Sequence, residues 1–496
     1  MNVLPNLKPP DGPAASVKGE RIEAVNAASR RALYKKREPI YPKLVHGRFR
    51  ALKWFLLAAT LGIYYGVPWL RWDRGADASA QAVLIDFPGR RFYFFFIEIW
   101  PNEIYFVTGL LILAALVLFL VTSLFGRVWC GYACPQTVWT DLYIAAERLV
   151  EGDRNQRIRL ARAPWSAVKV ARKAAKHALW LAIAAATGGA WIFYFHDAPT
   201  IFPQVFTGEA PITAYTFLAL LTCTTYTLAG AMREQVCTYM CPWPRIQAAL
   251  IDEDALSVTY RRDRGEPRGP HKKGDSWEGR GDCVDCSQCI AACPMGIDIR
   301  DGDQLECINC ALCIDACDSI MAKVSRPQGL IAYDTLKNIA RRERGEQPQY
   351  RFVRARTAIY ALAIAGVSAI VLFGLTHKST IDLGVRRDRN PTFVRLSDGS
   401  VRNGYTVRFE NRATGTANLS LSLETAAPLD VRVVGLPAGP LAFTLKSGEE
   451  RSLRLYATLK PGVTTQSAIP LSFVMTNMGS GDRSLAKTVF LSGGVP

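Results

Sequence analysis

Five long stretches of the chain contain no charged side chain, and this feature limits the possible folds most strongly. They cover about residues 54–70, 104–125, 178–195, 211–232 and 357–376. A helix rises about 1.5 Å per residue, so each stretch is long enough to cross roughly 30 Å of hydrocarbon. One such stretch could be a buried core helix, but five of them favour a membrane-spanning bundle.

The Lys and Arg residues of the connections predict the orientation of this bundle. Residues 1–53 hold twelve and residues 126–177 hold ten, whereas residues 197–210 hold none. The formal net charge is +17, and the basic residues flank the apolar stretches, which favours a membrane face over nucleic acid as the partner. The predicted cytoplasmic parts are 1–53, 126–177 and 233–356; the predicted outer parts are 71–103, 197–210 and everything after residue 377.

Eight of the thirteen cysteines form two matched runs. The first is Cys283-x-x-Cys286-x-x-Cys289-x-x-x-Cys293-Pro294, and the second places Cys307, Cys310, Cys313 and Cys317 at the same intervals. In two-cluster ferredoxins, each [4Fe–4S] cluster takes three cysteines from one run and the fourth from the other. This rule assigns Cys283, Cys286, Cys289 and Cys317 to one cluster, and Cys307, Cys310, Cys313 and Cys293 to the second. A zinc ribbon also uses Cys-x-x-Cys pairs but needs only four ligands, so two such runs favour iron and sulfur.

A second repeat, Cys-x-x-x-Cys-Pro, follows the second and fourth apolar stretches. It comprises Cys130 and Cys134 in one copy and Cys237 and Cys241 in the other, with Tyr132 and Tyr239 at matching positions. Pro after the second Cys suits the first turn of a helix, where a thiol is expected to have a lowered pKa. Thiolates are soft ligands that select copper(I). A copper site, a dithiol–disulfide relay and an electron-transfer contact surface therefore remain open, beside two inert cysteine pairs.

The remaining cysteine and the histidines suggest no further site. Cys223 lies in the middle of a predicted span and is expected to be a small core residue. His177 and His196 lie at opposite ends of one predicted helix, and no second span carries a central histidine. A haem between two facing imidazoles is therefore not expected.

The part of the chain after residue 380 changes character. Short alternating runs such as Tyr405-Thr-Val-Arg-Phe-Glu and Leu419-Ser-Leu-Ser-Leu-Glu are separated by turn residues, which is typical of an immunoglobulin-like β-sandwich. The predicted fold class is thus a multi-domain membrane protein: an α-helical transmembrane bundle of five spans, a cytoplasmic two-cluster ferredoxin-like domain, and this C-terminal sandwich. The predicted domains are a basic cytoplasmic segment (1–50), four spans (51–250), the ferredoxin-like domain (251–350), a fifth span (354–377) and a periplasmic sandwich (378–496).

Several longer motifs resemble one family over nearly the whole chain. They are Tyr41-Pro-Lys, Gly47-Arg-Phe-Arg, Gly126-Arg-Val-Trp-Cys-Gly-Tyr-Ala-Cys-Pro-Gln-Thr-Val-Trp, Cys237-Thr-Tyr-Met-Cys-Pro and Cys317-Asp-Ser-Ile-Met. With the ferredoxin runs and the sandwich, the chain resembles the cytochrome c oxidase accessory proteins of the FixG, RdxA or CcoG type. The resemblance implies a bacterial inner-membrane protein that reduces copper(II) to copper(I) for assembly of a cbb3-type oxidase. It also implies that Cys130, Cys134, Cys237 and Cys241 are the copper-interacting thiols.

Three functions follow as hypotheses. The first is a cupric reductase supplied by a cytoplasmic electron donor. The second is a quinol-linked electron carrier, and the third is a non-catalytic scaffold for oxidase assembly. The expected partners are membrane lipid, an unidentified cytoplasmic donor, and copper-handling and cbb3 oxidase assembly proteins; a homodimer stays open, and nucleic acid is not expected.

Overall fold

The computed structural model describes residues 22–26, 38–75, 78–272, 274–413, 415–437, 439–461 and 467–492. The chain divides into two compact units. One comprises Met1–Leu70 with Gln81–Ala369, and the other Arg71–Ala80 with Ile370–Pro496. The first unit holds the apolar helices and the cysteine-rich region, and the second holds the β-sandwich.

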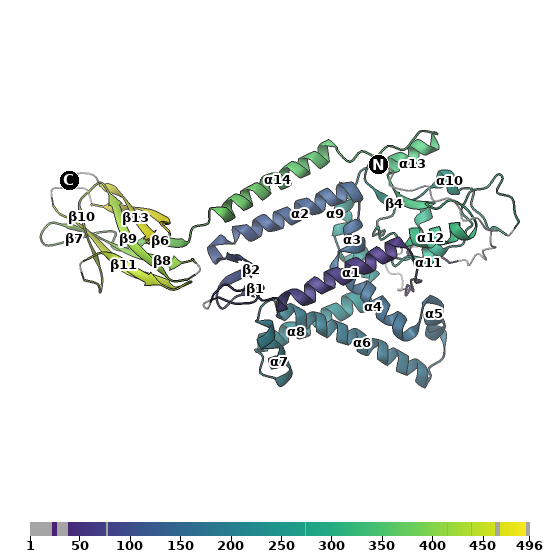
Figure 1. Ribbon diagram of the computed structural model, residues 1–496, viewed down its shortest axis with the longest axis horizontal. Coiled ribbons are helices and arrows are strands. Elements are labelled where there is room, and N and C mark those ends of the chain that lie inside the picture. The colour runs from purple at the N-terminus through teal and green to yellow at the C-terminus, as the bar shows by residue number, and fades with distance from the viewer. Residues whose placement is uncertain are drawn as a thin grey trace. The chain divides into compact units, whose positions relative to one another are not determined.

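The helices of the chain follow the apolar and cysteine-rich segments (Figure 1). Their bounds are α1 (Arg48–Gly66), α2 (Tyr105–Phe125), α3 (Val128–Tyr132), α4 (Pro135–Glu151), α5 (Arg154–Arg162), α6 (Ala167–Ile192), α7 (Ala198–Thr207), α8 (Ile212–Thr225), α9 (Trp243–Leu250), α10 (Arg262–Gly265), α11 (Gln288–Ala292), α12 (Leu312–Lys323), α13 (Leu336–Glu343) and α14 (Ala355–Thr376). Two π-helical turns, Tyr226–Met232 and Val236–Met240, continue the chain after α8.

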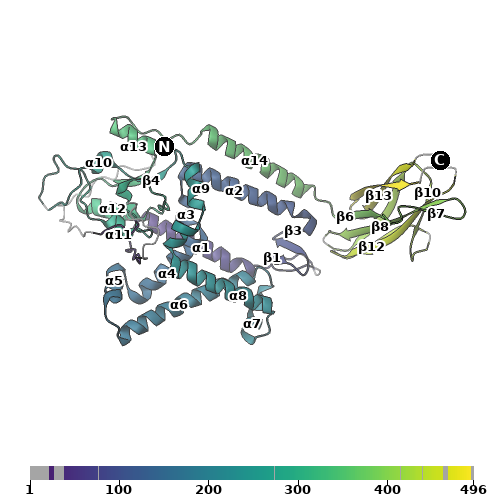
Figure 2. The same cartoon turned by 180° about the vertical axis from the view of Figure 1, so that it is seen from behind.

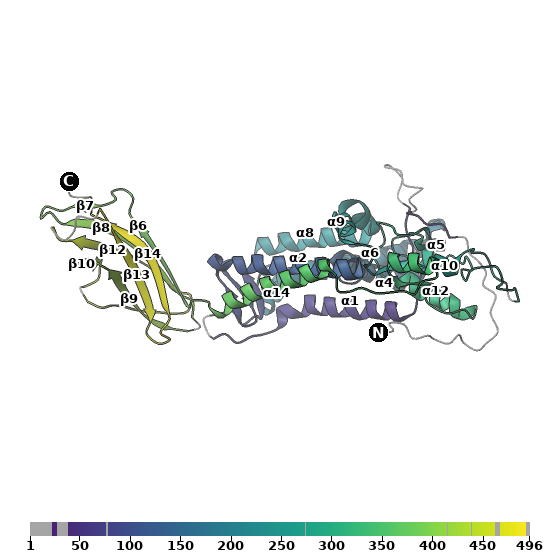
Figure 3. The same cartoon turned by 90° about the horizontal axis from the view of Figure 1, so that it is seen from above.

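Four helical segments among the described residues are long and apolar enough to cross a membrane. They are Arg48–Trp69, Pro101–Phe125, Ile212–Met232 and Ala355–Thr376. The axes of helices α1, α2 and α14 are roughly aligned (Figures 1 and 3), and the rings of Phe119 in α2 and Tyr360 in α14 lie 6.2 Å apart. These segments correspond to four of the five predicted spans.

The fifth predicted span, 178–195, belongs to α6, which does not meet the same criterion. This helix begins at Ala167, so its first turns carry Lys173 and Lys176 and the apolar part is short. Gly188 of α6 lets α8 approach closely, because a Cβ there would lie 2.8 Å from the carbonyl oxygen of Leu218. Membrane crossing by α6 stays a prediction.

Two segments that the charge rule places outside lie together at one end of the bundle. Strands β1 (Val83–Asp86), β2 (Arg91–Phe94) and β3 (Ile97–Ile99) form an antiparallel sheet. The Ile85 amide donates to the Tyr194 carbonyl (2.8 Å), and the Gln81 side chain accepts from the Ala198 amide (2.8 Å). This grouping is what the predicted orientation requires, although the side of the membrane stays a prediction.

Part of the predicted basic segment 1–50 packs against the cysteine-rich region. The Asn26 side chain donates to the Met295 carbonyl (2.7 Å), and the Lys43 amide donates to the Ala291 carbonyl (2.8 Å). Residues 1–21 and 27–37 of this segment lie outside the described residues. In the cysteine-rich region itself, β4 (Ser257–Tyr260) and β5 (Ile331–Asp334) pair in antiparallel fashion beside α11 and α12.

A carboxylate of the cysteine-rich region caps the first apolar helix. Asp315 of α12 accepts hydrogen bonds from the Phe49 amide (3.3 Å) and the Arg50 amide (2.7 Å), which are free donors in the first turn of α1. Its negative charge also suits the positive end of the helix dipole. A Cβ on Gly47 would lie 2.3 Å from Cγ of Asp315, so the absence of a side chain at Gly47 makes the contact possible.

The second unit is an antiparallel sandwich of two sheets (Figure 2). Its strands are β6 (Ile381–Arg387), β7 (Val394–Arg395), β8 (Val401–Asn411), β9 (Ala417–Thr425), β10 (Leu429–Val433), β11 (Leu441–Leu445), β12 (Glu450–Leu459), β13 (Ala468–Asn477) and β14 (Arg483–Leu491). The sheet orders are β10-β12-β8-β6, with β7 on β8, and β11-β9-β13-β14. Inward side chains such as Tyr405, Phe409, Phe473 and Phe490 are fully buried between the sheets, as the alternating pattern predicted.

Removal of the carboxylate that caps α1 should destabilise the first unit. We expect Asp315→Ala to lower the free energy of unfolding by about 0.5–2 kcal/mol, the usual effect of losing a helix cap. The measurement is the melting temperature of the detergent-solubilised protein. Asp301→Ala, which removes an exposed carboxylate of the same region, is the control. Equal melting temperatures for the two variants would mean that the cap contributes nothing.

Candidate functional site

The two cysteine runs fold into loops with the same unusual backbone. In each loop the residues just before and just after the second cysteine of the run have positive φ angles. These are Asp285 (49°) and Ser287 (54°) around Cys286, and Asn309 (51°) and Ala311 (59°) around Cys310. Each left-handed residue other than glycine costs roughly 1–2 kcal/mol, so such a conformation persists where a site imposes it.

This backbone directs amide groups at the cysteine sulfurs. The Gln288 amide donates to the sulfur of Cys286, and the Leu312 amide donates to that of Cys310. Successive amides in alternating right- and left-handed conformations form a concave site for anions. Both loops are therefore built to hold a negatively charged group bound through sulfur.

The eight thiols line two cavities. Each has a volume of about 20 Å³, which is room for about one water molecule. The cysteines of the first cavity are Cys283, Cys286, Cys289 and Cys317. Those of the second are Cys293, Cys307, Cys310 and Cys313, with Cys289 at the boundary between the two. The structure thus brings together the same two crossed groups that the spacing indicates.

The donor set of each cavity fits an iron–sulfur cluster. Four thiols surround each space, and no three Cys, His, Asp or Glu among the described residues converge on a position for one metal ion. Burial raises the pKa of the Cys293 thiol to about 12, and it raises the pKa of Cys289 and Cys307 further. A thiolate at such a buried position requires a compensating positive charge, and a coordinating metal both provides this charge and deprotonates the thiol.

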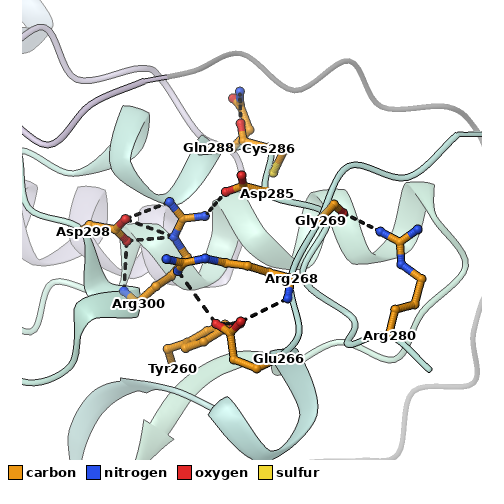
Figure 4. A network of polar contacts seen from close by, with 10 residues as sticks. All are labelled: Tyr260, Glu266, Arg268, Gly269, Arg280, Asp285, Cys286, Gln288, Asp298 and Arg300. Carbon is orange, nitrogen blue, oxygen red and sulfur yellow. Dashed lines mark hydrogen bonds and ion pairs between the residues drawn. The ribbon is translucent and has the colours of Figure 1, made fainter.

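The two cavities differ in charge. Arg300 lines the first cavity, where its guanidinium donates to Asp298 (2.7 Å) and Asp285 (2.6 Å) (Figure 4). Beside this group, Glu266 accepts from the Tyr260 hydroxyl (3.1 Å). The residues that line the second cavity are cysteines and apolar side chains. Groups bound in the two cavities therefore experience different electrostatic environments.

The four cysteines of the second repeat also come together, and we call Cys130, Cys134, Cys237 and Cys241 the four-thiol site. Burial raises the pKa of Cys130 and of Cys237 to about 12, and repulsion between these thiols adds to both shifts. Cys134 precedes Pro135, the first residue of α4, as predicted. Burial nevertheless raises its pKa more than the amides of the first turn lower it, so the expected depression of this pKa is wrong.

The two copies of the repeat have different surroundings, although their tyrosines occupy matching positions in the sequence. Tyr132 in α3 is buried and donates its hydroxyl hydrogen to the Cys310 carbonyl (3.2 Å). Tyr239 lies in a π-helical turn and is exposed, as is Met240 beside it. The first copy therefore faces the second cysteine loop, while the second copy has an open side.

Sequence reasoning missed two polar side chains at the four-thiol site. Gln247 of α9 accepts a hydrogen bond from the Cys130 sulfur (3.1 Å). Arg127 donates to the carbonyls of Gln304 (3.3 Å) and Pro244 (3.3 Å). Arg127 heads the first motif, but nothing in the spacing indicated its partners. The expectation for Cys223 is also wrong, because its side chain is exposed on α8 rather than part of a core.

Three known families match parts of the chain. Residues 232–336 match the family described as 4Fe-4S dicluster domain, and residues 107–150 match the one described as 4Fe-4S binding domain. Residues 371–493 match the immunoglobulin-like fold at the C-terminus of FixG. The matches confirm the ferredoxin-type and immunoglobulin-like regions. The match of residues 107–150 includes Cys130 and Cys134.

Curated relatives match almost the whole chain. The nitrogen fixation protein FixG of Rhizobium meliloti is 49% identical over 94% of this chain and 95% of its own length. The proteins RdxB and RdxA of Cereibacter sphaeroides are 50% and 52% identical, over 92% and 82% of this chain and 97% and 89% of their own lengths.

A crystal structure of a FixG-related protein from Vibrio parahaemolyticus is 17% identical and covers 23% of this chain and 97% of its own, with a TM-score of 0.21, too low to support a conclusion. The curated relatives and the matching 4Fe-4S families are enough to identify the family of this chain. This chain belongs to the FixG/RdxA family and is an iron–sulfur redox protein of that type.

Proposed function

We propose that the protein transfers electrons within a bacterial inner membrane and reduces copper(II) to copper(I) for assembly of a cbb3-type cytochrome c oxidase. The observation that carries the proposal is that the four thiols of this site lie close enough to interact electrostatically, beside the second cysteine loop. Thiolates prefer copper(I) over copper(II), so such a site favours the reduced product. Each reduction consumes one electron, which a cytoplasmic donor supplies.

In this proposal the eight thiols of the two cavities hold two [4Fe–4S] clusters, which supply one-electron transfer. The crossed sets are Cys283, Cys286, Cys289 with Cys317, and Cys307, Cys310, Cys313 with Cys293. The protein's own contribution is to exclude water and to direct amides such as that of Gln288 at the sulfurs. Amide hydrogen bonds and burial are the means by which a protein sets the potential of such a group.

The four-thiol site acts on copper as substrate. Its two copies of the repeat supply Cys130 with Cys134 and Cys237 with Cys241, and the exposed side at Tyr239 gives a route of entry. Gln247 hydrogen-bonds Cys130 and so orients this thiol. Copper-handling and oxidase assembly proteins are the proposed partners, with the sandwich in the periplasm and the cysteine domain in the cytoplasm.

The match of residues 107–150 to a 4Fe-4S binding domain favours one competing function for this site, which is to hold a third cluster. Iron analysis of a variant lacking Cys130 and Cys237 separates the two. If copper is the substrate, the variant retains the iron content of the wild type. If the site holds a cluster, the variant loses about four iron atoms per chain.

Removal of two thiols tests the copper site directly. We expect Cys130→Ala combined with Cys237→Ala to abolish most of the anaerobic copper(II) reduction, measured with a copper(I)-selective chelator, because half of the soft ligands are gone. Cys223→Ala, which removes an exposed thiol of α8, should match the wild type. Reduction by the double variant at the wild-type rate would refute the assignment, and oxidation of quinol without any effect on copper would favour a quinol-linked carrier.

The charge of Arg300 tests the assignment of the first cavity. A positive charge near a cluster stabilises its reduced form, so net charge is one determinant of the potential. We expect Arg300→Gln to lower the potential of one cluster by on the order of tens of millivolts and to leave the other unchanged, because Arg300 lines the first cavity and not the second.

Spectroelectrochemical titration with electron paramagnetic resonance (EPR) resolves the two potentials. Arg268→Gln removes a charge from the more exposed side of the same network (Figure 4) and is the control. Equal shifts of both potentials, or none, would contradict the placement of one cluster beside Arg300.

A further inference from the structure

We propose that Arg127, Gly131 and Tyr132 hold the second cysteine loop against the four-thiol site, and that this contact is the junction through which the electron reaches copper. The inference deepens the proposed function and rests on it. It assigns a positioning role to three residues of the first repeat, and it makes the second cysteine set, rather than the first, the immediate electron source.

Gly131 makes the closest approach between the two sites. It follows Cys130 in α3, and a Cβ at this position would lie 2.6 Å from the carbonyl oxygen of Ile308 and 3.0 Å from both N and Cα of Cys310. Such distances leave no room for a methyl group. The backbone next to a thiol of the four-thiol site therefore touches the backbone of a cysteine in the second set, with no side chain between them.

Two hydrogen-bonding side chains fix this approach. The buried Tyr132 hydroxyl donates to the Cys310 carbonyl (3.2 Å). The guanidinium of Arg127 donates to the carbonyls of Gln304 (3.3 Å), Leu305 and Cys307 (3.4 Å), and on its other side to that of Pro244 (3.3 Å). Arg127 thus connects the start of the second loop to α9, which follows Cys241.

A glycine just before α3 adds a third close approach. Gly126 has a φ of 59°, and a Cβ there would lie 2.7 Å from the side-chain nitrogen of Asn309. Asn309 is one of the two left-handed residues of the second loop. The segment 126–132 therefore follows the second loop over several residues.

The packing distinguishes the second cysteine set from the first. Cys130 lies in the same buried apolar cluster as Cys310 and Ile308, and Cys237 and Cys293 pack against that cluster. Cys237 also lines a cavity with Pro294, Met295 and Ile308. By contrast, Cys283 and Cys289 belong to a different buried cluster, formed with β4, β5 and α12.

The step at this junction is a simple one-electron exchange. The group held by the second cysteine set is oxidised by one electron, and one copper(II) at the four-thiol site is reduced to copper(I). No bond to carbon forms, and the thiols that bind copper release their protons on binding, before the electron moves. A low-potential donor on the cytoplasmic side restores the electron.

The test uses Gly131→Ala in the full-length protein. The added methyl group must push the second loop away, since its neighbours are backbone atoms. Gly62→Ala in α1, where a Cβ meets nothing within 4 Å, is the matched control. Each protein is reduced anaerobically with dithionite, and the return of the iron–sulfur absorption is followed by stopped flow after mixing with copper(II) or, separately, with ferricyanide.

We expect reoxidation by copper(II) to be several-fold slower in Gly131→Ala than in the control, while reoxidation by ferricyanide, iron content and both EPR signals stay unchanged. Tyr132→Phe, which removes the hydroxyl that hydrogen-bonds the Cys310 carbonyl and the Tyr333 side chain, should slow the copper reaction to a smaller extent. If Gly131→Ala loses iron, the rate of reoxidation of Tyr132→Phe by copper(II) tests the junction instead.

Three outcomes would overturn the junction. They are equal rates with copper(II) in both glycine variants, equal slowing with both oxidants, and, for Tyr132→Phe, a copper rate equal to that of the wild type. Failure of the proposed function has a different signature, because wild-type clusters would then not be reoxidised by copper(II) at all, or would be reoxidised as fast without Cys130 and Cys237.

Discussion

The left-handed backbone of the two cysteine loops is the constraint on which the rest of the structure depends. Asp285, Ser287, Asn309 and Ala311 adopt a conformation that costs energy in the chain alone, and this conformation directs amides at buried sulfurs. A bound anionic group recovers this cost through hydrogen bonds and metal–sulfur bonds. The crossed pairing also ties Cys317 to the first loop and Cys293 to the second, so that both cavities belong to one folded region.

This region is joined to the apolar helices by contacts at one end of the bundle. Asp315, between two cysteines of the second run, caps α1, and Arg127, just after α2, binds the carbonyls that begin the second loop. Helices α3 and α9 lie together beside the end of α2 (Figure 2) and carry residues on both sides of the four-thiol site. The two cysteine loops and the four-thiol site therefore lie together at one end of the bundle.

The sequence predicted those structural features that a short periodicity or a fixed residue spacing encodes. Four apolar spans, the sandwich strands and the two groups of cysteines follow from such patterns, because each reflects local geometry. Predictions from sequence patterns failed where a tertiary contact determines the surroundings or the pKa of a side chain. Tyr132 and Tyr239 occupy matching positions, yet Tyr132 is buried and hydrogen-bonded whereas Tyr239 is exposed, and burial reverses the expected pKa shift of Cys134. The role of Gly131 depends on a loop about 180 residues away in the chain, which no local pattern encodes.

Each of the two cysteine runs gives its fourth thiol to the cavity of the other run. EPR of the anaerobically reduced Cys317→Ala variant, compared with Cys283→Ala and Cys313→Ala, tests this exchange of ligands. We expect Cys317→Ala to lose the same cluster signal as Cys283→Ala, although Cys317 belongs to the other run, and to retain the signal of the second set. Loss of the signal that Cys313→Ala loses, or a wild-type protein with no iron–sulfur signal, would contradict it.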